Sequence, residues 1–152
     1  EHIGYLLRTS PDCDYFRRLR QAWDGPLIVK GVTQADDAAR LQDDGADAIW
    51  VSNHAGRQFD GAQGAIATLP QVRAATTLPV LFDCGSESGR DIIRAIALGA
   101  DFEMLGRAWH YALGALGASG PTHLADMLRK DMEANMGQLG TKTLTELAYR
   151  RV

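Results

Sequence analysis

Long apolar runs are missing from this sequence of 152 residues. No stretch approaches the roughly 20 apolar residues that a membrane-spanning helix needs, and no signal peptide is recognisable. An excess of positive charge is missing as well, because 16 lysines and arginines face 19 aspartates and glutamates, for a net charge of -3. That balance argues against a nucleic-acid-binding protein, which would need a basic face. The composition predicts a mildly acidic, soluble, cytoplasmic protein without a nucleic-acid partner.

Cysteine is scarce too, with only Cys13 and Cys84. Two cysteines do not make a disulfide framework, which favours a reducing intracellular setting. No histidine or cysteine stands at metal-ligand spacing from Cys84, so no metal site is expected there. Cys84 follows Asp83 at the end of a predicted strand, where it is either a small filler residue or part of the wall of a site.

What the sequence does contain is an alternation of short apolar segments and helical segments. Four segments are typical of buried strands, at 27–29, 47–51, 79–82 and 102–105. Helices are expected before, between and after them, over 15–23, 34–44, 69–76, 90–98, 108–117 and 120–136, with a last one after 143. Alternating strands and helices predict an α/β fold with a parallel sheet.

The ends of these helices carry recognisable signals. Thr33 and Thr143, each followed three residues later by an acid, predict capping boxes at helix starts. Gly45 and Gly99 are expected to end helices in the left-handed conformation. The phrase Gly-Ala-Asp follows a helix and precedes a strand at 45–47 and again at 99–101, so the units repeat.

Two architectures produce this alternation, a doubly wound sheet and a barrel. No G-x-G-x-x-G follows a strand, which argues against a dinucleotide-binding sheet. Glycine-rich segments instead end the last two strands, at 85–89 and 106–107, where (β/α)8 barrels bind phosphate. A complete barrel needs about 250 residues. The prediction is therefore a single partial domain over 1–152 that forms strands 5–8, the C-terminal half of a TIM (β/α)8 barrel; the absence of a methionine at Glu1 also indicates a fragment or processed product.

The most informative segment is 51–60, where an apolar strand turns polar at Ser52. His54 and Arg57 follow within one loop. Imidazole accepts a proton near neutral pH, and guanidinium binds a carboxylate through two hydrogen bonds. Loops at strand ends commonly carry such reactive groups. The pair predicts an acid or keto-acid substrate from which a proton is removed.

Several motifs together resemble the FMN-dependent α-hydroxy-acid oxidases and dehydrogenases, the glycolate oxidase and L-lactate dehydrogenase family. The motifs are PLIVKG at 26–31, VSNHAGRQ at 51–58, DCGSESG at 83–89, ALGAD at 97–101 and LGR at 105–107. They occur in the family's order over residues 25–147, which leaves 1–24 as a lead-in loop and helix. Segments 106–111 and 135–138 are most similar to the bacterial L-lactate dehydrogenase branch, which implies a cytoplasmic protein, free or peripheral at the inner face of the membrane.

The resemblance implies an oxidoreductase with FMN as cofactor that oxidises an L-2-hydroxy acid, L-lactate in the first place, to the 2-keto acid. It makes His54 the catalytic base, which also contacts the substrate, and Arg57 the clamp on the substrate carboxylate. The positions that match flavin contacts are Lys30 near flavin N1 and O2, Ser52, Asp83, Cys84 and Gly85 near the ribityl chain and phosphate, and Gly106 and Arg107 at the phosphate.

Two positions depart from the family pattern. Ala55 stands where the family usually has glycine, and Glu87 stands where it usually has a phosphate-binding arginine. A carboxylate beside a phosphate is repulsive by about 1 kcal/mol or more at contact. Phosphate binding is therefore expected from Arg107, Ser86, Ser88 and backbone amides, or from Arg90 reaching round, and not from the Glu87 side chain.

Other parts of the family's site have no counterpart in this sequence. The first four strands carry the tyrosines that hold substrate and the aspartate that orients the base, so activity is expected only as part of a longer chain, which would be a homo-oligomer. The alternative is an inactive half-barrel that binds a phosphate ligand or associates with itself. An isomerase of the IMP-dehydrogenase type would need a loop nucleophile that is absent here. The electron acceptor, whether quinone, cytochrome or oxygen, is left open.

Overall fold

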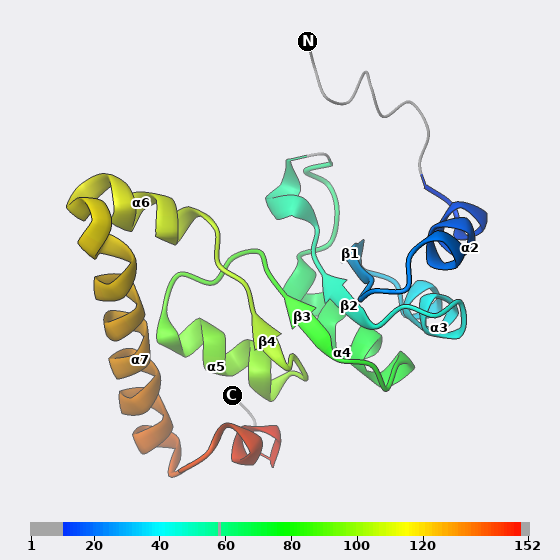
Figure 1. The fold of residues 1–152 in the computed structure, drawn as a ribbon. Coiled ribbons are helices and arrows are strands. Elements are labelled where there is room, and N and C mark those ends of the chain that lie inside the picture. Colours follow the sequence, from blue (N-terminus) through cyan, green and yellow to red (C-terminus); the bar gives the residue numbers. More distant parts are fainter. Residues whose placement is uncertain (1–10, 58, 150–152) are drawn as a thin grey trace.

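The computed structural model describes residues 11–57 and 59–149, which form a four-stranded parallel sheet with helices (Figure 1). The strands follow the chain in the order β1 (Ile28–Val32), β2 (Ala48–Val51), β3 (Val80–Phe82) and β4 (Phe102–Glu103). The helices are α2 (Cys13–Ala22), α3 (Ala35–Asp43), α4 (Ala65–Ala75), α5 (Gly89–Ala97), α6 (Arg107–Leu116) and α7 (Gly120–Leu139). Short 3-10 helices are η1 (His54–Gly56), η2 (Gly117–Ser119) and η3 (Leu144–Tyr149). The predicted α/β alternation and parallel sheet are confirmed.

Some predicted boundaries were wrong for reasons that lie in packing. β1 continues past Lys30 because Gly31, at φ +100°, forms an irregularity in the pairing with β2 and lets the strand resume at Val32. β4 is only two residues long, against the four expected. Helix α4 begins at Ala65 and carries Pro70 in its interior. The burial of one apolar face of α4 outweighs the hydrogen bond that the proline removes.

Both predicted capping boxes were also wrong. The N-cap of α3 is Gln34, whose side chain makes no capping hydrogen bond, and Thr33 lies one residue outside. At the other site the backbone N–H of Glu146 donates to the backbone oxygen of Thr143 at 3.2 Å, which gives the 3-10 helix η3. The stops were predicted correctly, because Gly45 and Gly99 adopt φ values of 94° and 111°.

The two faces of the sheet differ in what covers them. The face against the helices is a dry core, formed by Ile49, Val51, Val80 and Phe82 packed with residues of α3, α4 and α5. The alternate residues point to the opposite face, where the paired positions across the four strands are Lys30, Trp50, Leu81 and Phe102. Phe102 is 60% exposed there and Ile28 is 50% exposed. In a closed barrel this inner face would be filled by side chains from the remaining strands.

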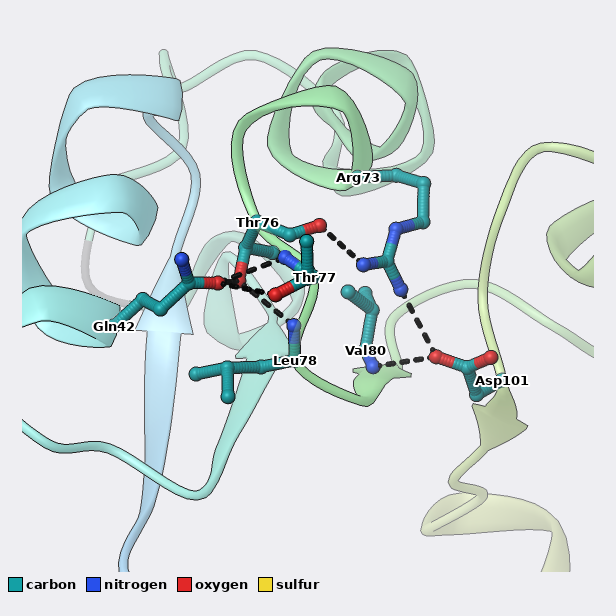
Figure 2. Close-up of polar contacts among 7 residues, drawn as sticks. All are labelled: Gln42, Arg73, Thr76, Thr77, Leu78, Val80 and Asp101. Atoms are coloured by element: carbon teal, nitrogen blue, oxygen red, sulfur yellow. Dashed lines mark hydrogen bonds and ion pairs between the residues drawn. The ribbon is translucent and has the colours of Figure 1, made fainter.

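The repeated Gly-Ala-Asp phrase has a defined structural role. Asp101 accepts a hydrogen bond from the backbone N–H of Val80 at 2.8 Å and one from Arg73 at 3.0 Å, while Arg73 also donates to the backbone oxygen of Thr76 (Figure 2). Asp47 makes the same bonds in the first unit, accepting from Leu27 N–H at 2.7 Å and from Arg20 at 3.0 Å. Each aspartate thus ties the start of its strand to the start of the preceding strand.

We expect Asp101→Ala to lower the free energy of unfolding by about 1–3 kcal/mol, because it leaves the Val80 N–H and the Arg73 guanidinium without their shared partner. Urea unfolding followed by circular dichroism measures the loss. The control is Asp126→Ala, which removes an exposed ion pair to Arg129 at 3.5 Å and should change stability by less than about 0.5 kcal/mol. Equal effects of the two substitutions would contradict the role given to Asp101.

Candidate active site

The carboxyl ends of the four strands open into a pocket of about 800 Å³. Eight of the nine residues predicted from the sequence line it, namely Lys30, His54, Arg57, Asp83, Cys84, Gly85, Gly106 and Arg107. The ninth, Ser52, is 1% exposed and does not line the pocket, but its hydroxyl contacts Lys30, Cys84 and the backbone N–H of His54. Helices α6 and α7 form the far wall with residues such as His110, His123 and Met127.

The loop after β2 has an unusual backbone. His54, Ala55 and Gly56 have φ values of 55°, 56° and 73°, in the left-handed region. A non-glycine residue costs about 1–3 kcal/mol in such a conformation, and this strain is typical of functional sites. The Asn53 side chain supports the turn by accepting a hydrogen bond from the Ala55 N–H at 3.0 Å. A glycine at position 55 would adopt this conformation without that strain.

Both His54 and Arg57, which this turn carries, line the pocket. The imidazole of His54 lies against the end of β1, where a Cβ added at Gly31 would stand 3.4 Å from His54 Nε2. Gly31 therefore keeps the space beside the ring open and also turns the strand at that point. The arrangement leaves a proton acceptor and a fixed cation facing one cavity.

A polar network joins the ends of β1, β2 and β3. Lys30 Nζ lies 2.8 Å from Asp83 Oδ2, donates to Ser52 Oγ at 2.8 Å, and stands 4.8 Å from the ring centroid of Trp50. Cys84 Sγ donates to Asp83 Oδ1 at 2.8 Å. Burial by itself raises the pKa of Asp83, but the contacts with Cys84 and Lys30 outweigh it and hold the pKa below its usual range. Asp83 is therefore ionised at neutral pH and fixes the ammonium of Lys30 at the pocket floor.

The loop between β3 and α5 forms another part of the wall. Cys84 has a φ of 85°, and Ser88 is the N-cap of α5, accepting a hydrogen bond from the Asp91 N–H at 3.2 Å. Glu87 lines the pocket and is exposed. Arg90 is not among the residues that line the pocket, and its guanidinium lies 3.6 Å from Asp91. The expectation that Arg90 reaches round to the site therefore finds no support in this arrangement.

Helix α6 supplies the positive end of a helix dipole to the same pocket. Its N-cap, Gly106, offers no side chain for capping, so the first amides of the helix are available to an anion. Arg107 is the first residue of the helix and also lines the pocket. These groups add positive charge to that of Lys30 and Arg57, which line the same pocket.

The comparisons with known proteins agree with this geometry. The family model described as FMN-dependent dehydrogenase matches residues 1–152. The chain belongs to the FMN-dependent dehydrogenase family. It is 43% identical to an L-lactate dehydrogenase of Vibrio cholerae over 97% of its own length and 40% of that protein. Members of this family use FMN. The pocket is large enough for that cofactor, and Lys30 and the uncapped N-terminus of α6 offer positive charge to an anionic group in it.

Solved structures show the same architecture. A lactate oxidase of Pediococcus acidilactici matches with a TM-score of 0.87 at 34% identity, over 93% of this chain and 40% of that chain. An (S)-mandelate dehydrogenase described as a monotopic membrane protein matches with a TM-score of 0.86 at 40% identity, over 90% and 36%. The described sheet and helices are half of such a TIM barrel, as predicted, and the chain spans about 40% of the length of these relatives. Within the described residues, none of the helices has both the length and the apolar character to cross a bilayer.

Three residues near the site were not singled out from the sequence. Gly31 and Trp50 shape the surroundings of His54 and Lys30, as described above. Glu103, on β4, is half-buried with both carboxylate oxygens inaccessible, and burial raises its pKa to about 7. The nearby carboxylates of Asp83 and Asp91 push that pKa in the same direction. The lysine–glycine pair at a strand end was an available signal for Gly31, whereas Glu103 resembled any polar residue in a short strand.

Proposed function

We propose that this chain forms the C-terminal half of the active site of an FMN-dependent L-2-hydroxy-acid dehydrogenase that acts on L-lactate. The observation that carries the proposal is the convergence of His54, Arg57 and the Lys30–Asp83 pair on one pocket at the carboxyl ends of the strands. Parallel barrels place their catalytic groups at this end. The similarity to the Vibrio cholerae L-lactate dehydrogenase supports the choice of substrate.

Each of the two loop residues has a distinct task in this proposal. Arg57 binds the substrate carboxylate with its guanidinium and thereby orients the hydroxyl-bearing carbon. His54 accepts one of the two protons that the hydroxy acid loses during oxidation, whether it leaves from carbon or from oxygen. Bound FMN would supply the acceptor for the two electrons and for the second hydrogen that the oxidation to the keto acid removes. His54 then releases its proton to solvent before the next turnover.

The remaining predicted residues hold the cofactor. Lys30 places positive charge on the pocket floor, where Ser52 and Asp83 keep its ammonium fixed. Cys84 and Gly85 form the strand end beside it, and Gly106 and Arg107 hold the phosphate at the start of α6. A charge that is fixed in advance stabilises a developing negative charge without reorganisation, which is the benefit of the network around Lys30.

The second candidate function is a half-barrel without catalysis that binds phosphate or associates with itself. The exposed Ile28 and Phe102 on the inner face favour this candidate when the chain is alone, because an open apolar face and two unpaired edge strands promote association. Homo-oligomer formation by the full-length protein, its peripheral or cytoplasmic location and its electron acceptor stay predictions.

We expect the 152-residue chain alone to bind FMN weakly or not at all and to oxidise L-lactate negligibly, since it covers only about 40% of the length of its relative. The same chain joined to the N-terminal part of the Vibrio cholerae relative should bind FMN at one equivalent, and L-lactate should bleach the flavin without oxygen. Absorbance at the flavin band measures both. Stoichiometric yellow protein from the chain alone would contradict its incompleteness, and a joined chain that binds FMN but is not bleached by any L-2-hydroxy acid would contradict the proposed reaction.

A further inference from the structure

Glu103 is a buried carboxyl group that the proposed chemistry does not use. Its partner across the sheet is Phe82, which belongs to the core between sheet and helices, so the Glu103 side chain points toward the helix layer. Both of its carboxylate oxygens are buried, and neither has a hydrogen-bond partner in the part of the chain that the structure describes. A buried carboxylate without partners is costly, whereas the neutral acid is much less so.

The position of Glu103 links it to the loop 83–88, which lines the pocket. The Ser86 side chain of that loop lies near Glu103, and so do the carboxylates of Asp83, at the start of the loop, and of Asp91, in α5. Burial is the largest influence on the pKa of Glu103 and raises it, the contact with Ser86 lowers it, and Asp83 and Asp91 raise it again, so that the pKa stays above its ordinary value. Asp91 holds the loop by accepting from Ser88 Oγ at 2.7 Å and from the Glu87 N–H at 3.2 Å. At the other end Asp83 accepts from Cys84.

The charges around Glu103 are mostly negative. On the β3 side, Asp83 is paired with Lys30 at 2.8 Å. On the α5 side, Asp91 lies 3.6 Å from Arg90, whose backbone N–H also contacts Asp131 of α7 at 3.3 Å. Both cations are thus engaged with carboxylates other than Glu103. An ionised Glu103 would add a third negative charge beneath a loop that two carboxylates already anchor.

We infer that Glu103 is a positioning residue for the loop 83–88, and that its neutral form is the one in which the loop binds the cofactor phosphate. Ionisation of Glu103 repels Asp83 and Asp91, weakens the anchoring of the loop and places negative charge below the phosphate. The part of this inference that concerns phosphate rests on the proposed function, while the part that concerns the loop does not. The affinity for FMN therefore falls as Glu103 ionises.

The direction of the pH effect follows from the raised pKa. An acid whose pKa lies near 7 in the folded chain is neutral at pH 6 and mostly ionised at pH 8. Negative charge at the loop thus appears as the pH rises through neutrality. Reciprocally, a bound phosphate dianion disfavours the ionised carboxylate and shifts the titration of Glu103 to higher pH.

The test is an NMR titration of the 152-residue chain from pH 5.5 to 8.5, with 13C-labelled glutamate carboxyl groups and 15N-labelled amides. It compares the unchanged chain with Glu103→Gln, which keeps the size of the side chain and removes the charge. Glu87→Gln is the matched control, because Glu87 is an exposed carboxylate of the same loop. The affinities for FMN and riboflavin are then measured at pH 6 and pH 8 for each protein joined to the N-terminal part of the Vibrio cholerae relative, since riboflavin lacks the phosphate.

We expect the loop amides to titrate together with the Glu103 carboxyl in the unchanged chain and in Glu87→Gln, and to lose that transition in Glu103→Gln. FMN affinity should fall about fivefold more between pH 6 and pH 8 in the unchanged chain than in Glu103→Gln, from one added charge at close range. Riboflavin should show no such difference. Loop amides that titrate equally in Glu103→Gln, or FMN affinities with the same pH dependence in both proteins, would overturn the inference. A loop transition that vanishes in Glu103→Gln, with no FMN binding by the joined protein at either pH, would support the loop role and count against the proposed cofactor site.

Discussion

Replacing His54 with glutamine is expected to slow the reduction of flavin by L-lactate about 10²- to 10⁴-fold, in the chain completed with the N-terminal part of its Vibrio cholerae relative. Glutamine matches the approximate size of histidine but cannot accept the proton that the hydroxy acid loses. FMN should stay bound, because the two cations proposed to hold it, Lys30 and Arg107, are not altered. Stopped-flow absorbance of the flavin under anaerobic conditions measures the rate.

The control for this experiment is His123→Gln. His123 lies on helix α7 in the far wall of the same pocket and is exposed. Its replacement removes an imidazole from the pocket without touching the strained loop, so the reduction rate should stay within about twofold. A His54→Gln protein that is reduced at the unchanged rate would remove His54 from the role of base. Equal losses in both variants would show that the pocket responds to any change of its walls.

Gly89→Ala should lower the free energy of unfolding by about 3–5 kcal/mol, a loss large enough to unfold many domains. An added Cβ would stand 2.4 Å from the backbone nitrogen of Met132 and 2.7 Å from the backbone oxygen of Leu128. These atoms belong to the backbone of α7, so the clash is relieved only if α5 and α7 move apart. That movement would open the closely packed interface between two helices that flank the β3 and β4 units.

Gly114→Ala is the matched control, because a Cβ at Gly114 in helix α6 meets nothing within 4 Å. Alanine favours a helix over glycine by up to about 1 kcal/mol, so this variant should be unchanged or slightly more stable. Urea unfolding of both variants beside the unchanged chain gives the two differences. A Gly89→Ala protein as stable as Gly114→Ala would contradict the close approach of α5 and α7.

Much of the fold could be predicted because it depends on local chemistry. The apolar segment 79–82 could only be buried as a strand, and Gly99 could end the preceding helix at little cost in the left-handed region. The elements that were predicted wrongly depend on contacts far along the chain. Pro70 is tolerated inside α4 because Leu69 and Val72 beside it are buried in the core, which no local signal could indicate.

The candidate site was predicted in the same uneven way. His54, Arg57 and the glycine-rich strand ends follow from motifs whose residues are close in the sequence. The pair of Lys30 and Asp83 joins residues 53 positions apart, and it forms only because β1 and β3 flank β2 in a parallel sheet. The capping-box signal of Thr143 and Glu146 is just as local, but no capping box forms there. The Glu146 carboxylate instead accepts a hydrogen bond from the backbone N–H of Lys142 at 2.8 Å.

The sequence by itself determined the alternation of strands and helices, the family, and the residue types at the carboxyl ends of the strands. The tertiary structure alone decided which charged groups are solvated and which are buried. Glu103 shows the difference, because an acid in a short strand has an ordinary pKa until the helix layer and two carboxylates surround it. The burial of a side chain and its electrostatic interactions with nearby charges depend on residues that are distant in the chain, and both arise only after the chain has folded.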